Sequence, residues 1–220
     1  MALLAAPLLA LLLAGPYIWI ENHRCGFASI RKAIILYIFL FYMVCAYCLV
    51  ILPLPDPEAV AALTDSETQL VPFRFLWDIA TKTPFRFLQP STWLSGLTDA
   101  TVLVPVYNIL LLLPFGAFLR YYLGTDKKKT VLFSFLLSLF FELTQLTGLY
   151  FLYARGYRIF DVDDLMLNTL GGLAGWYCAR PLINLLPSRR ALDAFARQKA
   201  ARRPSAGLSL RHEGRRLAGL

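Results

Sequence analysis

Histidine and cysteine are scarce in this chain of 220 residues, which has two histidines and four cysteines. His23 and His212 both lie in basic loop or tail sequence, so catalysis by a serine–histidine or cysteine–histidine pair loses support. Cys45 and Cys48 form a CxxC motif inside an apolar stretch with aromatic neighbours. A redox or zinc site needs a polar, partly exposed setting and further ligands, so structural cysteines are favoured. Neither a metal nor a cofactor is predicted.

Charged residues are also few, at 16% of the chain, whereas soluble proteins have about a quarter. Hydrophobic residues make up 58%, and the mean hydropathy is +0.56. A membrane-spanning helix needs roughly 20 mainly apolar residues. Five stretches meet that need: 2–20, 33–52, 100–119, 130–152 and 165–186. The sequence therefore predicts an all-α, multi-pass helix bundle of about five transmembrane helices in the cell membrane.

Positive residues outnumber negative ones, with 22 Lys and Arg against 14 Asp and Glu. Seventeen of the positive residues lie in three segments: 21–32, 120–129 and the chain from Arg180 onward. The other five lie in the two remaining loops, 53–99 and 153–164. Because positive loops stay in the cytoplasm, we expect the N-terminus outside and the C-terminus inside. The basic tail, 187–220, is interpreted as a cytoplasmic segment that attracts anionic lipids, and no nucleic-acid partner is predicted.

The first apolar stretch has two interpretations. Residues 1–32 form a transmembrane helix with a basic cytoplasmic loop, or they begin with a signal peptide that is removed. A signal peptide starts with positive charge, whereas here the charge follows the stretch, at Arg24, Arg31 and Lys32. This order favours a retained transmembrane helix.

The longest predicted loop, 53–99, faces the outside and contains a small repeat. The pentapeptide Pro-Phe-Arg-Phe-Leu occurs at 72–76 and again at 84–88, with Trp77 and Trp93 nearby. Alternating aromatic and arginine residues suit a segment that lies at the membrane interface. An interfacial cap over the bundle is favoured, and a binding function for this loop is the alternative.

Polar residues form a stripe at the start of the last predicted helix. Asp161, Asp164 and Asn168 follow the spacing i, i+3 and i+7, which places them on one helical face. Gly171 and Gly175 extend this face as a GxxxG pattern, which lets another helix approach closely. The stripe therefore should face protein. Asp163 lies off this face and is expected to be a solvated loop residue.

The fourth predicted helix has a matching stripe, formed by Ser134, Ser138, Glu142 and Gln145. Counted from Leu152, Glu142 lies roughly 15 Å below the outer boundary at 1.5 Å per residue. An intramembrane carboxylate is a functional candidate by default. The alternatives are a neutral Glu142 or one that pairs with Arg155 or Arg158 to hold the bundle together.

Two asparagines are expected at a similar depth. At the same rise per residue, Asn168 lies roughly 6 Å below the outer boundary, counted from Asp164. Asn108 lies roughly 12 Å below it, counted from Ala100. With Glu142 they are predicted to line one pocket that opens outward. Alternatively, Asn108 is structural and bonds backbone groups freed by the prolines of its helix. A divalent cation held by Asp161, Asp164 and Glu142 is a minor alternative.

Three stretches, taken in order, resemble successive motifs of the VanZ-like family of bacterial integral membrane proteins. They are "YNILLLLPFGAFL", "FELTQ" and "RIFDVDDLMLNTLGGLAG". "LVPFRFL" (70–76) is similar to the family's outer-loop Pro-Phe stretch, with Gln69 where the family often has Asn. The resemblance covers about residues 33–186, which we take as the VanZ-like membrane domain. The matching positions are Asn108, Pro114, Gly116, Glu142, Gln145, Arg158, Asp161, Asp164, Asn168 and Gly171.

The family takes its name from a member that raises resistance to teicoplanin, a lipoglycopeptide that acts on the cell wall. The resemblance implies a role in glycopeptide resistance or envelope maintenance and supplies no reaction. The first hypothesis is that the outer pocket binds a lipid-linked cell-wall precursor or the lipoglycopeptide, beside membrane lipids. The predicted ligand-binding residues are Asn108, Glu142, Gln145, Arg158, Asp161, Asp164 and Asn168.

The second hypothesis is a membrane-embedded enzyme that modifies a lipid or wall component. Glu142 or Asp164 would act as acid or base. No candidate nucleophile accompanies them, which counts against a covalent route. A transporter is a weaker third hypothesis, because the predicted helices show no internal repeat.

Overall fold

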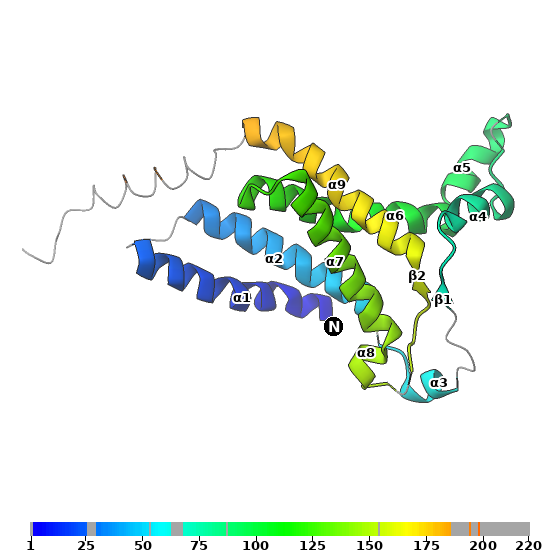
Figure 1. Cartoon of the computed structure of the whole chain (residues 1–220), viewed down its shortest axis with the longest axis horizontal. Helices are drawn as coiled ribbons and strands as arrows, with labels where there is room; N and C mark the ends of the chain where they lie inside the picture. The colour runs from blue at the N-terminus through cyan, green and yellow to red at the C-terminus, as the bar shows by residue number, and fades with distance from the viewer. Residues whose placement is uncertain are drawn as a thin grey trace, which may run out of the picture.

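Long helices in alternating directions form the body of the molecule (Figure 1). The computed structural model describes residues 2–25, 30–52, 54–62, 68–86, 88–153 and 155–185, together with positions 194 and 198. The long helices are α1 (Ala2–Cys25), α2 (Ile30–Ile51), α6 (Ala100–Phe118), α7 (Lys127–Leu146) and α9 (Val162–Leu185). A π-helix, η2 (Leu119–Leu123), continues α6. The predicted all-α class is confirmed, and the basic tail lies outside the described residues except at those two positions.

Several of these helices have the length and composition of membrane spans. Among the described residues, three qualify: Lys32–Ile51, Ala100–Leu123 and Lys127–Leu146. The apolar run of α1, Leu4–Ile20, is shorter, and α9 carries two aspartates in its first turn. The chain is therefore a helical membrane protein. The count of five spans and the orientation in the membrane stay predictions.

Helices α6 and α9 pack closely at glycines, as the GxxxG pattern predicts. A Cβ atom added to Gly171 would collide with the carbonyl oxygen of Ile109. One added to Gly175 would collide in the same way with the carbonyl oxygen of Leu113. Glycine is required here because the two backbones touch, which fixes the middle of α9 against α6.

The polar stripes of α7 and α9 face each other inside the bundle, which confirms that they face protein. Asn168 Nδ2 donates a hydrogen bond to Ser138 Oγ at 2.9 Å. Ser134 and Ser138 are fully buried, and a Cβ atom on Gly172 would collide with the Ser134 hydroxyl. These contacts set the depth of α9 relative to α7.

The fourth helix ends earlier than the predicted boundary at residue 152. Helix α7 stops at Leu146, and the short α8 (Gly148–Phe151) contains left-handed residues. Gly148 has φ +60°, and a Cβ atom there would crowd the Arg155 carbonyl oxygen, so the helix cannot continue straight. Glu142 therefore lies roughly 6 Å from the end of its helix, and the predicted helix end at residue 152 is wrong, while its depth in the membrane stays a prediction.

The long connection between α2 and α6 folds into short elements that reach the start of α9. Strand β1 pairs in parallel with β2, with Thr68 opposite Phe160 and Gln69 opposite Asp161. In Figure 1, α4 and α5 extend beyond the end of the long helices. The elements are α3 (Pro57–Ala61), β1 (Thr68–Gln69), α4 (Arg74–Lys82), η1 (Pro90–Thr92), α5 (Trp93–Leu97) and β2 (Phe160–Asp161).

Candidate functional site

A cleft of about 520 Å³, here called the polar cleft, lies where the long connection meets the starts of α6 and α9. Of the predicted ligand-binding residues, only Asp161 and Asp164 line it. The full lining is Thr68, Gln69, Arg74, Phe75, Asp78, Ala100, Thr101, Val104, Pro105, Ile159, Asp161, Asp163, Asp164 and Leu167.

Negative charge is in excess in the polar cleft. One guanidinium group, that of Arg74, lines the cleft with the carboxyl groups of Asp161, Asp163 and Asp164. A fourth carboxyl group, that of Asp78, is already paired with Lys82 Nζ at 2.8 Å. Within the described part of the chain, the Arg74 side chain makes no hydrogen bond or ion pair. Burial raises the pKa of Asp161 above its ordinary value, and the nearby Asp163 charge adds to this rise while Arg74 opposes it. A cationic group in the cleft would therefore be stabilised by several acids at once.

Asp163 holds the start of α4 in place. Its Oδ1 accepts a hydrogen bond from the Phe73 backbone N–H at 2.6 Å, and its Oδ2 accepts one from the Phe75 N–H at 2.9 Å. Asp163 is only 3% exposed, so the expectation of a solvated loop residue is wrong. The reason is that a helix N-terminus about 90 positions earlier supplies the donors. Asp163 thereby places Arg74 at the cleft.

Gln69 connects β1 to an acidic residue of the cleft. Its Nε2 donates to Asp161 Oδ1 at 3.3 Å and to the Val71 carbonyl at 2.7 Å. Its Oε1 accepts from the Val71 N–H at 2.7 Å. The side chain therefore folds the chain after β1 back toward the polar cleft, ahead of α4.

Asn108, Glu142 and Asn168 do not line the polar cleft, contrary to the expected common pocket. Asn108 donates from Nδ2 to Asp164 Oδ1. Glu142 Oε2 accepts from the Asp161 backbone N–H at 3.2 Å, and Glu142 is 4% exposed. Asn108 thus holds the side chain of Asp164, Glu142 holds the backbone of Asp161, and Asn168 joins α9 to α7. Their predicted contact with a ligand stays a prediction.

Gln145 and Arg158 both bind the end of α2. Gln145 Nε2 donates to the Val50 carbonyl at 2.8 Å, and Arg158 Nη1 donates to the same oxygen at 3.4 Å. Among the described residues, no carboxylate lies within ion-pair distance of Arg158, so it makes no direct ion pair with Glu142, although its charge acts on that carboxylate. Gln145 thus attaches the end of α2 to α7, and Arg158 attaches it to the loop that precedes α9.

The cation alternative for Asp161, Asp164 and Glu142 finds no support in the side-chain arrangement. No three His, Cys, Asp or Glu side chains of the described residues lie close enough together to hold a metal ion. Calcium and magnesium sites need several oxygen ligands that converge.

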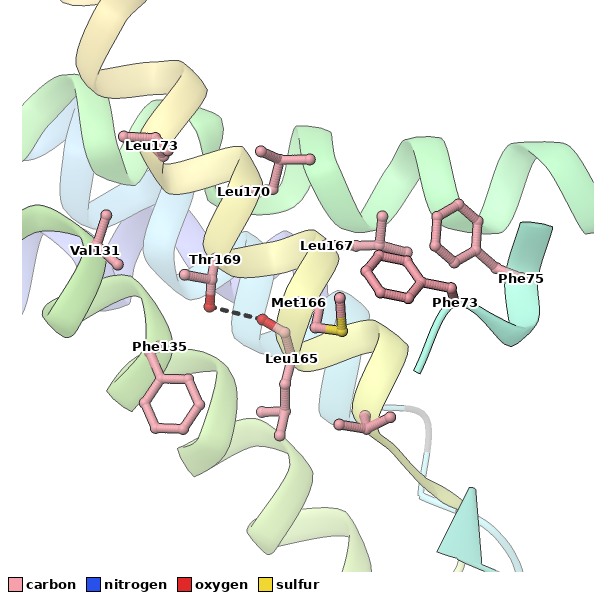
Figure 2. Close-up of a pocket in the computed structure, with 11 residues that line it drawn as sticks. Phe73, Phe75, Val131, Phe135, Leu165, Met166, Leu167, Thr169, Leu170 and Leu173 are labelled. Atoms are coloured by element: carbon pink, nitrogen blue, oxygen red, sulfur yellow. Dashed lines mark hydrogen bonds between the residues drawn. The ribbon is translucent and has the colours of Figure 1, made fainter. Parts of the chain in front are cut away.

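A second cavity, here called the apolar groove, follows α9 beside α7 and has a volume of about 530 Å³ (Figure 2). Phe75 and Leu167 line both the apolar groove and the polar cleft. The two cavities are therefore neighbours with opposite chemistry. The lining of the groove is Phe73, Phe75, Val131, Phe135, Val162, Leu165, Met166, Leu167, Thr169, Leu170 and Leu173.

Glu142→Gln should leave the melting temperature in detergent almost unchanged. Glutamine keeps an oxygen that accepts the Asp161 N–H, whereas Glu142→Leu leaves that donor unpaired at a cost of about 1–3 kcal/mol. Thermal melts of both variants test this positioning role. Equal destabilisation by glutamine and leucine would show that the hydrogen bond to Asp161 is not what Glu142 supplies.

Sequence reasoning missed Arg74 and Asp78 as cleft residues. Arg74 lies in the first copy of the Pro-Phe-Arg-Phe-Leu repeat. The arginine of the second copy, Arg86, instead donates to the Thr83 and Phe85 carbonyls at 3.2 and 3.0 Å, outside the cleft lining. One sequence signal could have identified Arg74: the first copy of the repeat resembles the family's Pro-Phe stretch, which distinguishes it from the second copy.

Comparison with known proteins agrees with the motifs. A sequence model described as VanZ/LLP1 matches residues 39–185, which is well over half of the chain. No curated protein and no solved structure matches the chain.

Proposed function

Because this chain belongs to the VanZ/LLP1 family, we propose that it binds an amphiphilic or lipid-linked ligand in the polar cleft. Through this binding it contributes to tolerance of teicoplanin-type lipoglycopeptides or to maintenance of the cell envelope. The ligand is a lipid-linked wall precursor, a membrane lipid or the lipoglycopeptide.

The observation that carries the proposal is the juxtaposition of the two cavities. The polar cleft offers Arg74 and several carboxyl groups, and the apolar groove begins at the shared residues Phe75 and Leu167. A ligand with a polar head and a hydrocarbon tail matches this arrangement, because each part meets groups of its own polarity.

The location of the cleft suits a ligand of the outer envelope. It lies at the end of the bundle that carries the 53–99 connection, which the distribution of Lys and Arg predicts to face outward. Teicoplanin acts on that side of the membrane, so a protein acting there need not move the drug across.

The geometry favours binding over catalysis. Glu142 does not line the cleft and accepts a backbone hydrogen bond, which suits a supporting role. Asp164 does line it, and its Oδ1 accepts from Asn108. A supporting or binding role accounts for both carboxylates without a reaction.

Arg74→Gln should remove the contribution to lipoglycopeptide tolerance in cells, at unchanged protein abundance. The Arg74 side chain makes no described hydrogen bond or ion pair, so its loss removes ligand contact without removing support for the fold. Losing a charged hydrogen bond weakens binding by roughly ten- to a hundredfold. The measurement is the inhibitory drug concentration for cells carrying each variant.

Arg86→Gln is the matched control, because Arg86 occupies the same position in the second repeat and lies outside the cleft lining. It should retain the tolerance of the unchanged protein. Full tolerance with Arg74→Gln, or equal loss with both variants, would contradict the role of the polar cleft.

A further inference from the structure

The apolar groove has no polar surface to offer a ligand. Its one hydroxyl-bearing residue, Thr169, donates to the Leu165 carbonyl at 2.6 Å, as Figure 2 shows. In the same view, Phe73 and Phe75 lie beside one end of the α9 segment that lines the groove, and Leu173 lies at the other end. Such a surface in a membrane protein suits a hydrocarbon chain.

The length of the groove matches one leaflet of a bilayer. Its lining residues on α9 run from Val162 to Leu173, which corresponds to roughly 16 Å at 1.5 Å per residue. Half of a hydrocarbon core of about 30 Å is roughly 15 Å. A single acyl chain of the leaflet next to the polar cleft can therefore fill the groove.

The charges of the polar cleft define the head group. Arg74 is available for a phosphate group. Asp161 and Asp164 each accept hydrogen bonds through Oδ1, and within the described part of the chain the second carboxylate oxygen of each has no partner. These oxygens suit an ammonium group, whereas a head group with negative charge alone would meet Asp161, Asp163 and Asp164, besides Asp78 that is paired with Lys82.

We propose that one phospholipid with an amine-bearing, zwitterionic head group occupies both cavities. Its phosphate contacts Arg74, its ammonium group contacts Asp161 and Asp164, and one acyl chain lies in the apolar groove. This inference rests on the proposed function and specifies the ligand class of that site.

The test is thermal melting of the purified full-length protein in detergent with added lipid. Phosphatidylethanolamine and phosphatidylglycerol of identical short acyl chains are titrated separately. We expect phosphatidylethanolamine to raise the melting temperature with saturation and phosphatidylglycerol to have a much smaller effect. Equal shifts with both lipids would overturn the assigned head group.

Two variants separate the groove from the head-group site. Leu170→Trp fills the groove at a half-exposed position and should abolish the lipid-dependent shift, whereas Leu136→Trp, on α7 outside the groove, should preserve it. Asp161→Asn should reduce the preference for phosphatidylethanolamine. It tests the head-group site independently, even where Leu170→Trp fails to fold. A full shift with Leu170→Trp, or an unchanged preference with Asp161→Asn, would overturn the proposal.

The two proposals fail in distinguishable ways. If Arg74→Gln abolishes drug tolerance while phosphatidylethanolamine gives no selective shift, the polar cleft functions with another ligand and the lipid assignment is wrong. If the selective shift occurs while Arg74→Gln keeps full tolerance, the lipid assignment stands and the proposed function is wrong.

Discussion

Gly171→Ala should strongly destabilise the protein, because the added methyl group meets the backbone of α6. The Cβ atom would collide with the carbonyl oxygen of Ile109, which cannot move without the helix that carries it. Overpacking of this kind costs about 1–3 kcal/mol of stability. Pushing α6 away from α9 also breaks packing contacts between the two helices, which lowers stability further. The measurement is the melting temperature in detergent, which we expect to fall clearly.

Gly15→Ala is the matched control for this change. Gly15 also lies inside a long helix, α1, but a Cβ atom there would meet nothing within 4 Å. Alanine favours a helix over glycine by roughly 1 kcal/mol, but the following Pro16 disfavours a helical residue that carries a Cβ. These effects oppose each other, so this variant should melt close to the temperature of the unchanged protein. Similar losses in the two variants would mean that helix propensity or expression, not the α6–α9 contact, explains the effect.

Asp163→Ala should produce the second large loss, affecting both stability and function. It removes the acceptor for the N–H groups of Phe73 and Phe75, at about 1–3 kcal/mol for each unpaired donor. Phe73 also has φ 64°, an uncommon conformation for a bulky residue, which these hydrogen bonds help to hold. We expect a lower melting temperature and loss of drug tolerance, since Arg74 follows Phe73 directly.

Asp161→Asn changes another aspartate of the polar cleft and, unlike Asp163→Ala, should not lower stability. Asparagine keeps an oxygen for the Asp163 N–H and the Gln69 amide, and it removes a charge that burial disfavours. Because the folded-state pKa of Asp161 is raised, its charge reduces stability above its unfolded pKa, so this variant should melt at the same temperature or higher. A larger loss with Asp161→Asn than with Asp163→Ala would contradict the assigned roles.

Short-range pattern was sufficient to predict the long helices, apart from the end of α7, and the helix face that packs against protein. The spacing of Asp161, Asp164 and Asn168 identified one helical face, and Gly171 and Gly175 identified the contact with another helix. These features follow from the period of a helix, which depends only on neighbouring residues.

The polar cleft could not be predicted in the same way, because distant segments form it. Asp163 is off the helical stripe, and its role appears only when α4 arrives from about 90 positions earlier. The pairing of β1 with β2 involves two residues on each strand, too few to leave a periodic pattern. The early end of α7 depends on Gly148, whose positive φ is not encoded by hydropathy.

Native mass spectrometry of the protein, extracted in mild detergent, tests the central claim most directly. It reports the mass of any bound amphiphile, whatever the chemical class of that molecule. The unchanged protein and Arg86→Gln should each retain one bound amphiphile that Arg74→Gln loses. The same bound masses, in the same proportions, for all three proteins would contradict ligand binding in the polar cleft.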